Sequence, residues 1–290
     1  MTTPLFVDSF LYNGDDIVRL RLAYLYNYVD LFYITESIYS FSGEKKSEFM
    51  IDKNMHLFQP YLSKIRFLKV HDKLTNIPFQ PSGNEQMDLH IKTKIAFIEE
   101  KAQRNYVRQH LLRDLENKDY ILCLCDCDEI YDLRTIGSDK KALFNEIDGK
   151  HLLLRMKRYN YNYIFFHSDD WEMAYCITSN VVKEFEDLDH LRTHKLGNRT
   201  FRRVGGWHFT YFMTKEEILR KIQCFSHVDL NVPAYTNLDV IGELIKKGSD
   251  VFGNNEKPVK FYAFENSFND YPPEFKPYFL DLIKKQGLIS

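Results

Sequence analysis

The sequence lacks a long apolar run, a block of positive charge, and a basic N-terminal segment followed by an apolar stretch. A membrane-spanning helix needs roughly 20 apolar residues and a secretory leader needs such a basic start, so neither is expected. The formal net charge of −2 gives no broad positive field, which argues against nucleic acid as the main partner. We therefore expect a cytoplasmic protein with no transmembrane segment.

Cysteine is scarce too, with five residues, an odd number. Three of them, Cys123, Cys125 and Cys127, alternate along one short segment, where neighbours bridge each other poorly. A disulfide framework is not indicated, and a reducing compartment fits. The sequence has no internal repeat, and 290 residues can bury one large core, so we predict a single domain.

Aromatic residues, in contrast, are abundant, with 19 Tyr and 23 Phe. Clustered tyrosines, as in residues 158–166, suit a cleft that stacks on sugar or base rings. Packing in a protein core uses the same residues. Both interpretations remain open from the sequence.

The first half of the chain alternates predicted strands and helices. Short buried strands are expected at residues 5–10, 29–37 and 65–70. A helix begins at Asp15 or Asp16, and residues 87–115 form a long amphipathic helix. Residues 71–86, with two prolines and a glycine, predict a loop. This order indicates an α/β fold with a mostly parallel central sheet flanked by helices.

The second half is expected to contain strand-like segments followed by helices. The strands fall at residues 151–166 and 172–182, and short helices at 139–147 and 279–285. Thr214 and Glu217 have the spacing of a capping box, which marks a further helix start. Pro258, Pro272, Pro273 and Pro277 punctuate the tail.

The segment 120–130 begins as an apolar strand and ends in three acids, Asp126, Asp128 and Glu129. In open α/β sheets, ligands gather beyond the carboxyl ends of the strands. Two carboxylates one residue apart can share Mg²⁺ or Mn²⁺, and the ion can neutralise a bound diphosphate. This pattern suggests a metal-assisted sugar or phosphoryl transfer, although a strand that ends in solvent has the same appearance.

The three cysteines of this segment suggest a rival thiolate metal site. Alternate residues of a strand share one face, so the sulfurs would lie in a row along about 13 Å. Such a row does not converge on one tetrahedral zinc ion. We therefore predict that Cys123, Cys125 and Cys127 are small buried packing residues.

Six segments together resemble glycosyltransferase family 17, the family of the β-1,4-mannosyl-glycoprotein 4-β-N-acetylglucosaminyltransferase. They are residues 6–22, 29–46, 103–111, 119–130, 206–212 and 225–231, in the family's order. The resemblance implies a GT-A fold and an Mn²⁺-dependent (or Mg²⁺-dependent) inverting transfer from a UDP-sugar, UDP-GlcNAc, to a glycan acceptor. It divides the chain into a nucleotide-binding half (1–135), an acceptor-binding half (136–250) and a C-terminal extension (251–290). Tyr131 and Gly14 depart from the family pattern, which has proline and glutamate there.

The resemblance also implies residue roles. Asp126, Asp128 and Glu129 fall on the family's Asp-x-Asp-Glu, with Asp128 as the metal ligand and Asp126 holding the ribose or the metal through water. His208 or His227 would add an imidazole ligand, although a histidine between aromatic residues is also typical of a core. The expected nucleotide contacts are Glu36, Ser37, Gly43, Arg104, Asp126, Arg199 and Trp207, with Arg202 and Arg203 near the diphosphate.

Inverting transfer needs a carboxylate base within hydrogen-bond reach of the acceptor hydroxyl. The candidates are Asp170, Glu172, Asp229 and Glu129, of which Asp170 and Glu172 flank Trp171, an aromatic suited to a sugar. Two other functions stay open. A metal-dependent phosphoesterase would use the same acidic strand end but normally needs further ligands for a second metal. A carbohydrate-binding protein without catalysis would use the aromatic surface.

Overall fold

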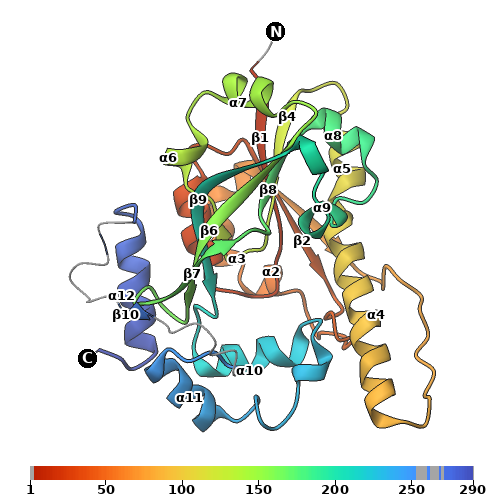
Figure 1. The fold of residues 1–290 in the computed structure, drawn as a ribbon, viewed down its shortest axis with the longest axis vertical. Coiled ribbons are helices and arrows are strands. Elements are labelled where there is room, and N and C mark those ends of the chain that lie inside the picture. Colours follow the sequence, from red (N-terminus) through yellow and green to blue (C-terminus); the bar gives the residue numbers. More distant parts are fainter. Residues whose placement is uncertain (1–2, 253–259, 262–267, 269–270, 290) are drawn as a thin grey trace.

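The computed structural model describes residues 3–252, 260–261, 268 and 271–289, and within them one ten-stranded sheet forms the centre (Figure 1). The strand order is β10-β7-β6-β8-β4-β1-β2-β3, with β9 paired to β6 and β5 paired to β9. The strands are β1 Leu5–Leu11, β2 Leu31–Ser37, β3 Ile65–Val70, β4 Tyr120–Leu124, β5 Glu129–Ile130, β6 His151–Asn160, β7 Phe165–Trp171, β8 Tyr175–Thr178, β9 Thr200–Thr210 and β10 Lys260–Phe261.

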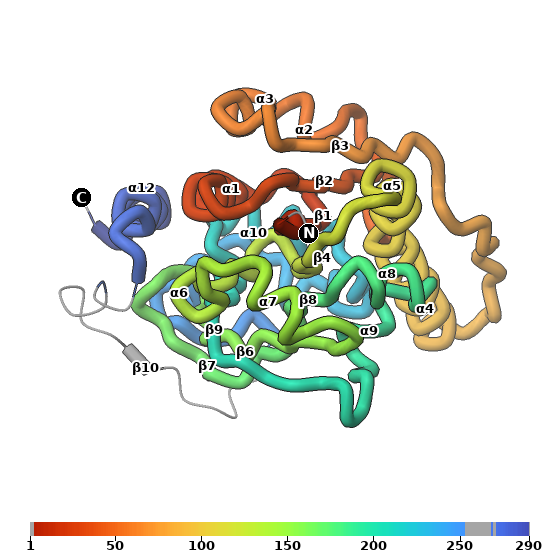
Figure 2. Tube along the Cα trace, turned by 90° about the horizontal axis from the view of Figure 1, so that it is seen from above, coloured from red at the N-terminus to blue at the C-terminus, as the bar shows by residue number. Residues whose placement is uncertain are grey.

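Helices cover both faces of this sheet, and Figure 2 shows α12 packed beside α1 at one side. The α-helices are α1 Val18–Leu25, α2 Met50–Lys53, α3 Met55–Phe58, α4 Glu85–Asn105, α5 Val107–Asp114, α6 Leu133–Ile136, α7 Lys140–Ile147, α8 Ser179–Glu184, α9 His190–Thr193, α10 Lys215–Cys224, α11 Leu238–Lys247 and α12 Phe275–Lys285. The 3₁₀ helices in the described part of the chain are η1 Gln59–Lys64, η2 Gly197–Arg199 and η3 Val228–Leu230.

The prediction of a parallel sheet is confirmed for the first half of the chain. Strands β3, β2, β1 and β4 are all parallel neighbours. Successive residues of β1 point into different cores, since Phe6 belongs to one buried cluster and Val7 to the other. A strand buried on both faces in this way reads as a nearly continuous apolar run, which explains why the pattern was visible in the sequence.

The second half makes the sheet mixed, which the expected parallel pattern missed. β8 runs antiparallel to both β4 and β6, and β7 runs antiparallel to β6. Antiparallel neighbours need only short connections, whereas parallel ones need a crossover of a dozen or more residues. Only residues 161–164 and 172–174 link these three strands, so they cannot be parallel.

The predicted helices are present, with changes at three boundaries. α1 begins at Val18 rather than at Asp15 or Asp16, and its N-cap is Ile17. The capping box of Thr214 and Glu217 is present at the start of α10. The long helix is interrupted at Tyr106, which divides it into α4 and α5. The last helix begins earlier than expected, at Phe275, because Pro277 falls in its first turn, where the missing N–H costs no helical hydrogen bond. Pro258 lies outside the described residues.

A fully buried ion pair joins the sheet to α1. The guanidinium of Arg21 donates to both Asp8 oxygens, at 2.8 and 2.6 Å, and neither side chain is exposed to solvent. The same guanidinium donates to the carbonyl oxygens of Asp126 and Glu129, at 3.1 and 2.6 Å. Arg21 therefore holds the loop that follows β4 in place.

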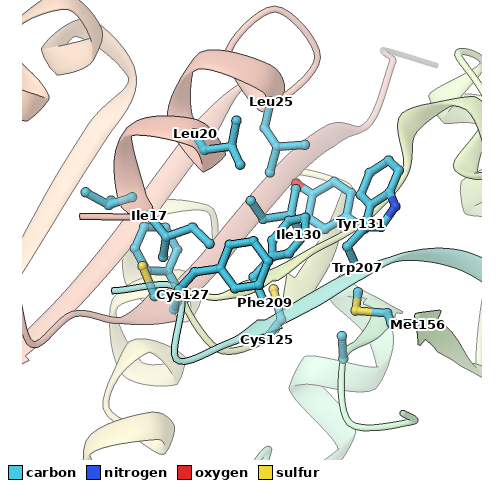
Figure 3. Packing of buried hydrophobic residues seen from close by; sticks show 14 of the residues in the cluster. Ile17, Leu20, Leu25, Cys125, Cys127, Ile130, Tyr131, Met156, Trp207 and Phe209 are labelled. Carbon is cyan, nitrogen blue, oxygen red and sulfur yellow. The ribbon is translucent and has the colours of Figure 1, made fainter. Parts of the chain in front are cut away.

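Apolar packing surrounds this loop as well. Figure 3 shows Leu20 of α1, and Ile17 directly before that helix, gathered around Ile130 and Tyr131. Cys125 and Cys127 lie in the same cluster. The acidic residues of the loop are thus carried by a backbone that is fixed on several sides.

We expect Arg21→Met to lower the free energy of unfolding by about 3–5 kcal/mol, because it leaves the Asp8 carboxylate buried without its partner. Urea denaturation measures this loss. The matched control is Arg19→Met on the same helix, whose partners Asp16 and Asp281 lie at the surface. Its effect should stay within about 1 kcal/mol. Equal effects of the two substitutions would contradict a special role for the buried pair.

A second prediction concerns pH. His151 on β6 is buried against the edge of the Tyr175 ring, and burial lowers its pKa from 6.5 to about 4. Between these values the unfolded chain binds a proton that the folded chain does not, so stability falls as the pH drops below 6.5. We expect His151→Gln to remove about 1–2 kcal/mol of the stability difference between pH 7 and pH 5. Denaturant titrations at both pH values test this. If the free energy of unfolding of the variant differs between pH 7 and pH 5 by as much as that of wild type, the prediction is wrong.

Candidate functional site

A cleft of about 420 Å³ opens where β1 and β4 end. Its walls come from the loops after these strands, from α4, from β9 and from α10, which lies across the strand ends in Figure 1. Leu11 closes β1, and Asp126 follows the end of β4 at Leu124. The cleft therefore lies at the carboxyl edge of the parallel strands, as expected for a ligand site in an α/β sheet.

The lining is unusually rich in charge. It contains the carboxylates of Asp15, Glu100, Asp126, Asp128 and Asp189, the cations Lys101, Arg104, Arg192 and Lys221, and the imidazoles of His208 and His227. Of the residues proposed from the sequence, Asp126, Asp128, Arg104, His208 and His227 thus meet in one cleft. They come from segments up to about 120 residues apart in the chain.

Asp126 lies between two arginines. Arg104 and Arg192 each donate to one of its carboxylate oxygens, both at 2.8 Å. Burial would raise the pKa of Asp126, but these two guanidinium groups outweigh it and hold the pKa well below the usual range. Arg104 also bridges Glu100 and Asp189, at 2.8 and 2.6 Å, so one guanidinium connects three carboxylates of the cleft.

Asp128 is buried and is held by different groups. Its Oδ2 accepts from Lys221 Nζ at 3.0 Å, and its Oδ1 lies 3.7 Å from His208 Nε2. Lys221 also reaches Asp15 Oδ2, at 3.1 Å. Burial would lower the pKa of Lys221, but Asp128 and Asp15 raise it well above its ordinary value, so the ammonium stays charged.

Burial favours the neutral state of His208, which is the state that a metal ligand requires. Its ring lies against Trp171, with centroids 4.1 Å apart, and is buried. Burial lowers its pKa, although the neighbouring Asp128 carboxylate acts in the opposite direction. His227 lies at the exposed rim of the cleft, edge-on to Phe97 at 4.8 Å.

The alternation of β9 decides which of its residues reaches the cleft. His208 lines it, whereas Trp207 and Phe209 on either side pack with Phe275 in the core. Between Val204 and Trp207, β9 has one residue more than the paired stretch of β6 between Arg155 and Lys157, so Gly205–Gly206 forms a β-bulge. Gly206 has φ +127°, and a Cβ there would lie 2.6 Å from the Ile130 carbonyl oxygen, so this bulge requires glycine. Trp207, proposed as a nucleotide contact, is thus a core residue.

Glu129 does not line the cleft. Its fully buried carboxylate accepts from Trp171 Nε1 and from the Asp126 N–H, both at 2.6 Å, and from Arg192 at 3.2 and 3.3 Å. Because its carboxylate oxygens already accept these bonds, Glu129 orients Trp171 and Arg192.

Glu36, proposed as a nucleotide contact, is also used internally. Its carboxylate accepts from the Met50 and Ile51 N–H groups, each at 2.7 Å, and from Lys46, so it caps the start of α2. Ser37 lines a narrow pocket beside the cleft. Gly43, with φ +95°, forms the turn of its loop.

The other arginines proposed for the diphosphate lie outside the cleft lining. Arg199 pairs with Glu184 at 2.9 Å, Arg202 pairs with Glu172, and Arg203 pairs with Glu146. Their positions in a basic stretch of sequence did not reveal that each already has an acidic partner across the surface.

The carboxylates proposed as the base are not in the cleft lining either. Glu172 is clamped by Lys195 and Arg202, at 2.8 and 2.9 Å. Burial acts to raise its pKa, but these two cations lower it on balance. Asp170 is exposed on β7, and Asp229 is exposed on η3 near Thr93. Trp171 between Asp170 and Glu172 does line the cleft, as proposed for that aromatic.

Sequence reasoning missed Arg192, Asp189, Glu100 and Lys221. Arg192 and Asp189 belong to α9 and its start, which carry no recognisable motif. For Lys221 a signal was present, because it lies three residues after Ile218 and one before Ile222, the buried residues of α10. A charged residue on the buried side of an amphipathic helix points to a polar site.

Cys123, Cys125 and Cys127 are buried in the core, as predicted. Among the described residues, the one close group of three metal-binding side chains is Asp8, Cys123 and Cys125, all buried. β4 ends at Leu124, so Cys125 leaves the predicted row and its sulfur lies 4.0 Å from that of Cys123. Burial raises the pKa of both thiols, and Asp8 is bound by Arg21, which fits packing rather than zinc binding.

An α/β protein with a charged cleft at the carboxyl edge of its parallel strands has the general form of a nucleotide- or sugar-binding enzyme. The chain belongs to glycosyltransferase family 17, whose model matches residues 5–271. This membership supports glycosyl transfer, with a sugar donor and an acceptor as substrates. No curated protein matches the chain. Within the described part of the chain, every helix is too short or too polar to cross a bilayer.

Proposed function

We propose that the protein is a metal-dependent inverting glycosyltransferase that moves GlcNAc from UDP-GlcNAc to a sugar hydroxyl. The observation that carries this proposal is the meeting of Asp126, Asp128, His208 and Arg104 in one cleft. The cleft volume of about 420 Å³ lies in the usual range of small-molecule sites. Membership of family 17 supports the reaction class, and the donor and stereochemistry follow from the resemblance of the motifs.

Asp15, Asp128 and His208 offer the ligand types that suit Mn²⁺ or Mg²⁺, although as placed their ligand atoms are not as close together as those of Asp8, Cys123 and Cys125. Asp128 and Asp15 offer hard oxygen ligands on either side of one position, and His208 offers a neutral imidazole beside Asp128. When bound there, the ion would neutralise charge on the leaving diphosphate. Asp126 is assigned a different role, because its two arginines already occupy it.

The remaining groups suit the two ends of a nucleotide sugar. Arg104, Arg192 and Lys101 give the cleft cationic side chains that can face a diphosphate. Trp171 offers an aromatic wall, and its indole N–H bond to Glu129 fixes the orientation of the ring. Aromatic faces of this kind bind the apolar faces of sugars, so we place the acceptor beside Trp171.

The base is one of two carboxylates, Glu100 and Asp189. Both line the cleft, and both are joined to Arg104, at 2.8 and 2.6 Å. Asp126 is bound by two arginines and Asp15 and Asp128 would hold the ion, whereas Glu100 and Asp189 each accept one bond, from Arg104, so we take these two as the candidates for the base.

The test of the function is a screen of UDP-, GDP- and CMP-sugars with and without Mn²⁺. We expect UDP-GlcNAc with Mn²⁺ to raise the melting temperature and to be hydrolysed slowly without acceptor. Asp128→Asn should lower that hydrolysis by about 10²–10³-fold, since it removes a charge that holds the ion. The matched control is Asp170→Asn, at an exposed position outside the cleft lining, which should retain activity.

Three outcomes would contradict this assignment. Stabilisation and hydrolysis with a different donor would overturn the donor. Release of phosphate from simple phosphate esters without sugar transfer would indicate a phosphoesterase. Glycan binding that survives Asp128→Asn, with no turnover of any nucleotide sugar, would indicate a carbohydrate-binding protein.

A separate prediction identifies the base. Glu100→Gln and Asp189→Asn both keep a hydrogen-bonding side chain, and the substitution that removes the base should lower kcat for transfer by about 10²–10⁴-fold. The KM for the donor should change far less. Glu172→Gln, outside the cleft lining, is the control. If neither substitution lowers kcat beyond the control, the base lies elsewhere.

A further inference from the structure

Lys221 occupies a place in the cleft that suits a cation. Its Nζ lies between two carboxylates, 3.0 Å from Asp128 Oδ2 and 3.1 Å from Asp15 Oδ2. The other oxygen of Asp128 faces His208 Nε2 at 3.7 Å. The ammonium therefore neutralises the same side chains that would ligate a divalent ion.

The ammonium is needed there because the two carboxylates lie close together in a poorly solvated place. The side chains of Asp128 and Asp15 are only 9% and 13% exposed. Like charges so placed repel each other unless a cation lies between them. The nearby Arg104 and Arg192 are bound to Asp126, so Lys221 carries this task.

The side chain can move while its helix stays in place. α10 is anchored by the capping box at Thr214 and by the buried Ile218 and Ile222. The lysine side chain itself is a flexible stem of four carbons and is partly exposed. Its Nζ also lies 5.7 Å from the centre of the Tyr211 ring, another wall of the cleft.

We propose that Lys221 is a built-in competitor for the metal, which withdraws from Asp15 and Asp128 when the ion binds and then contacts the diphosphate of the donor. This inference rests on the proposed metal-dependent transfer. A single positive charge balances two carboxylates incompletely, whereas a divalent ion balances them fully. Release of Lys221 without an anion to receive it is unfavourable, so the nucleotide strengthens metal binding and the metal strengthens nucleotide binding.

The test is a titration of the nucleotide-free protein with Mn²⁺, in which free Mn²⁺ is followed by electron paramagnetic resonance. Lys221→Met should bind Mn²⁺ at least about 10-fold more tightly than wild type, because the competing charge is gone. Lys221→Arg should bind as weakly as wild type. Lys140→Met removes a lysine that pairs with Asp30, away from the cleft, and should not change the affinity.

Addition of UDP separates this inference from the proposed function. UDP should tighten Mn²⁺ binding by at least about 10-fold in wild type. The effect should be much smaller in Lys221→Met, because the variant has no displaced ammonium for the diphosphate of UDP to bind. If wild type binds Mn²⁺ and Lys221→Met binds it no more tightly, the competition is refuted while the metal-dependent reaction stands. If no variant binds Mn²⁺ even with UDP, both proposals are refuted.

A measurement on wild type covers the case in which Lys221→Met does not fold. Limited acetylation followed by mass spectrometry reports how accessible each lysine amine is. Addition of Mg²⁺ to the protein without UDP should increase the acetylation of Lys221 relative to that of Lys140, since the ion releases the Lys221 amine from both carboxylates. Unchanged labelling at a concentration where Mg²⁺ raises the melting temperature would overturn the proposal.

Discussion

The guanidinium of Arg21 is the interaction on which the site depends. It binds both oxygens of Asp8 and three acceptors between the end of β4 and the start of β5, which are the sulfur of Cys125 and the carbonyl oxygens of Asp126 and Glu129. All of these bonds except the partly buried one to the Asp126 carbonyl lie in the interior. A planar, permanently charged group with five donors suits this task, since one side chain satisfies several acceptors at fixed angles. The backbone that carries Asp126 and Asp128 is therefore held in a fixed position.

Above this support, the cleft is organised as alternating charges. Asp126 is bound by two arginines, and Asp128 and Asp15 share one lysine. No large net charge has to be held in a poorly solvated space, which would be costly. A charged ligand entering such a site exchanges partners with groups already in place. Binding energy then depends on how much better the new partners are, rather than on bare attraction.

The fold could be predicted where the sequence pattern is local. β1, β2 and β3, the start of α10 and the long helix all follow from apolar periodicity and capping residues. The mixed half, in which β6 runs parallel to β9 and antiparallel to β7 and β8, could not, because the order of its strands is set by pairing and not by composition. For the site, the strand end carrying Asp126 and Asp128 was visible. The partners Arg192 and Lys221 were not, since nothing in one segment shows which distant cation will lie opposite a carboxylate.

Glu36 and Trp207 illustrate the reverse case, in which a motif was visible and its use was not. Both belong to segments that resemble the family, yet Glu36 caps α2 and Trp207 packs against Phe275. The bulge at Gly205–Gly206 explains the second. The additional residue reverses the side of the sheet to which each later side chain of β9 points. Without the additional residue, Trp207 would face the cleft and His208 would be buried among aromatic rings. The two glycines of the bulge therefore determine which side chains of β9 reach the cleft.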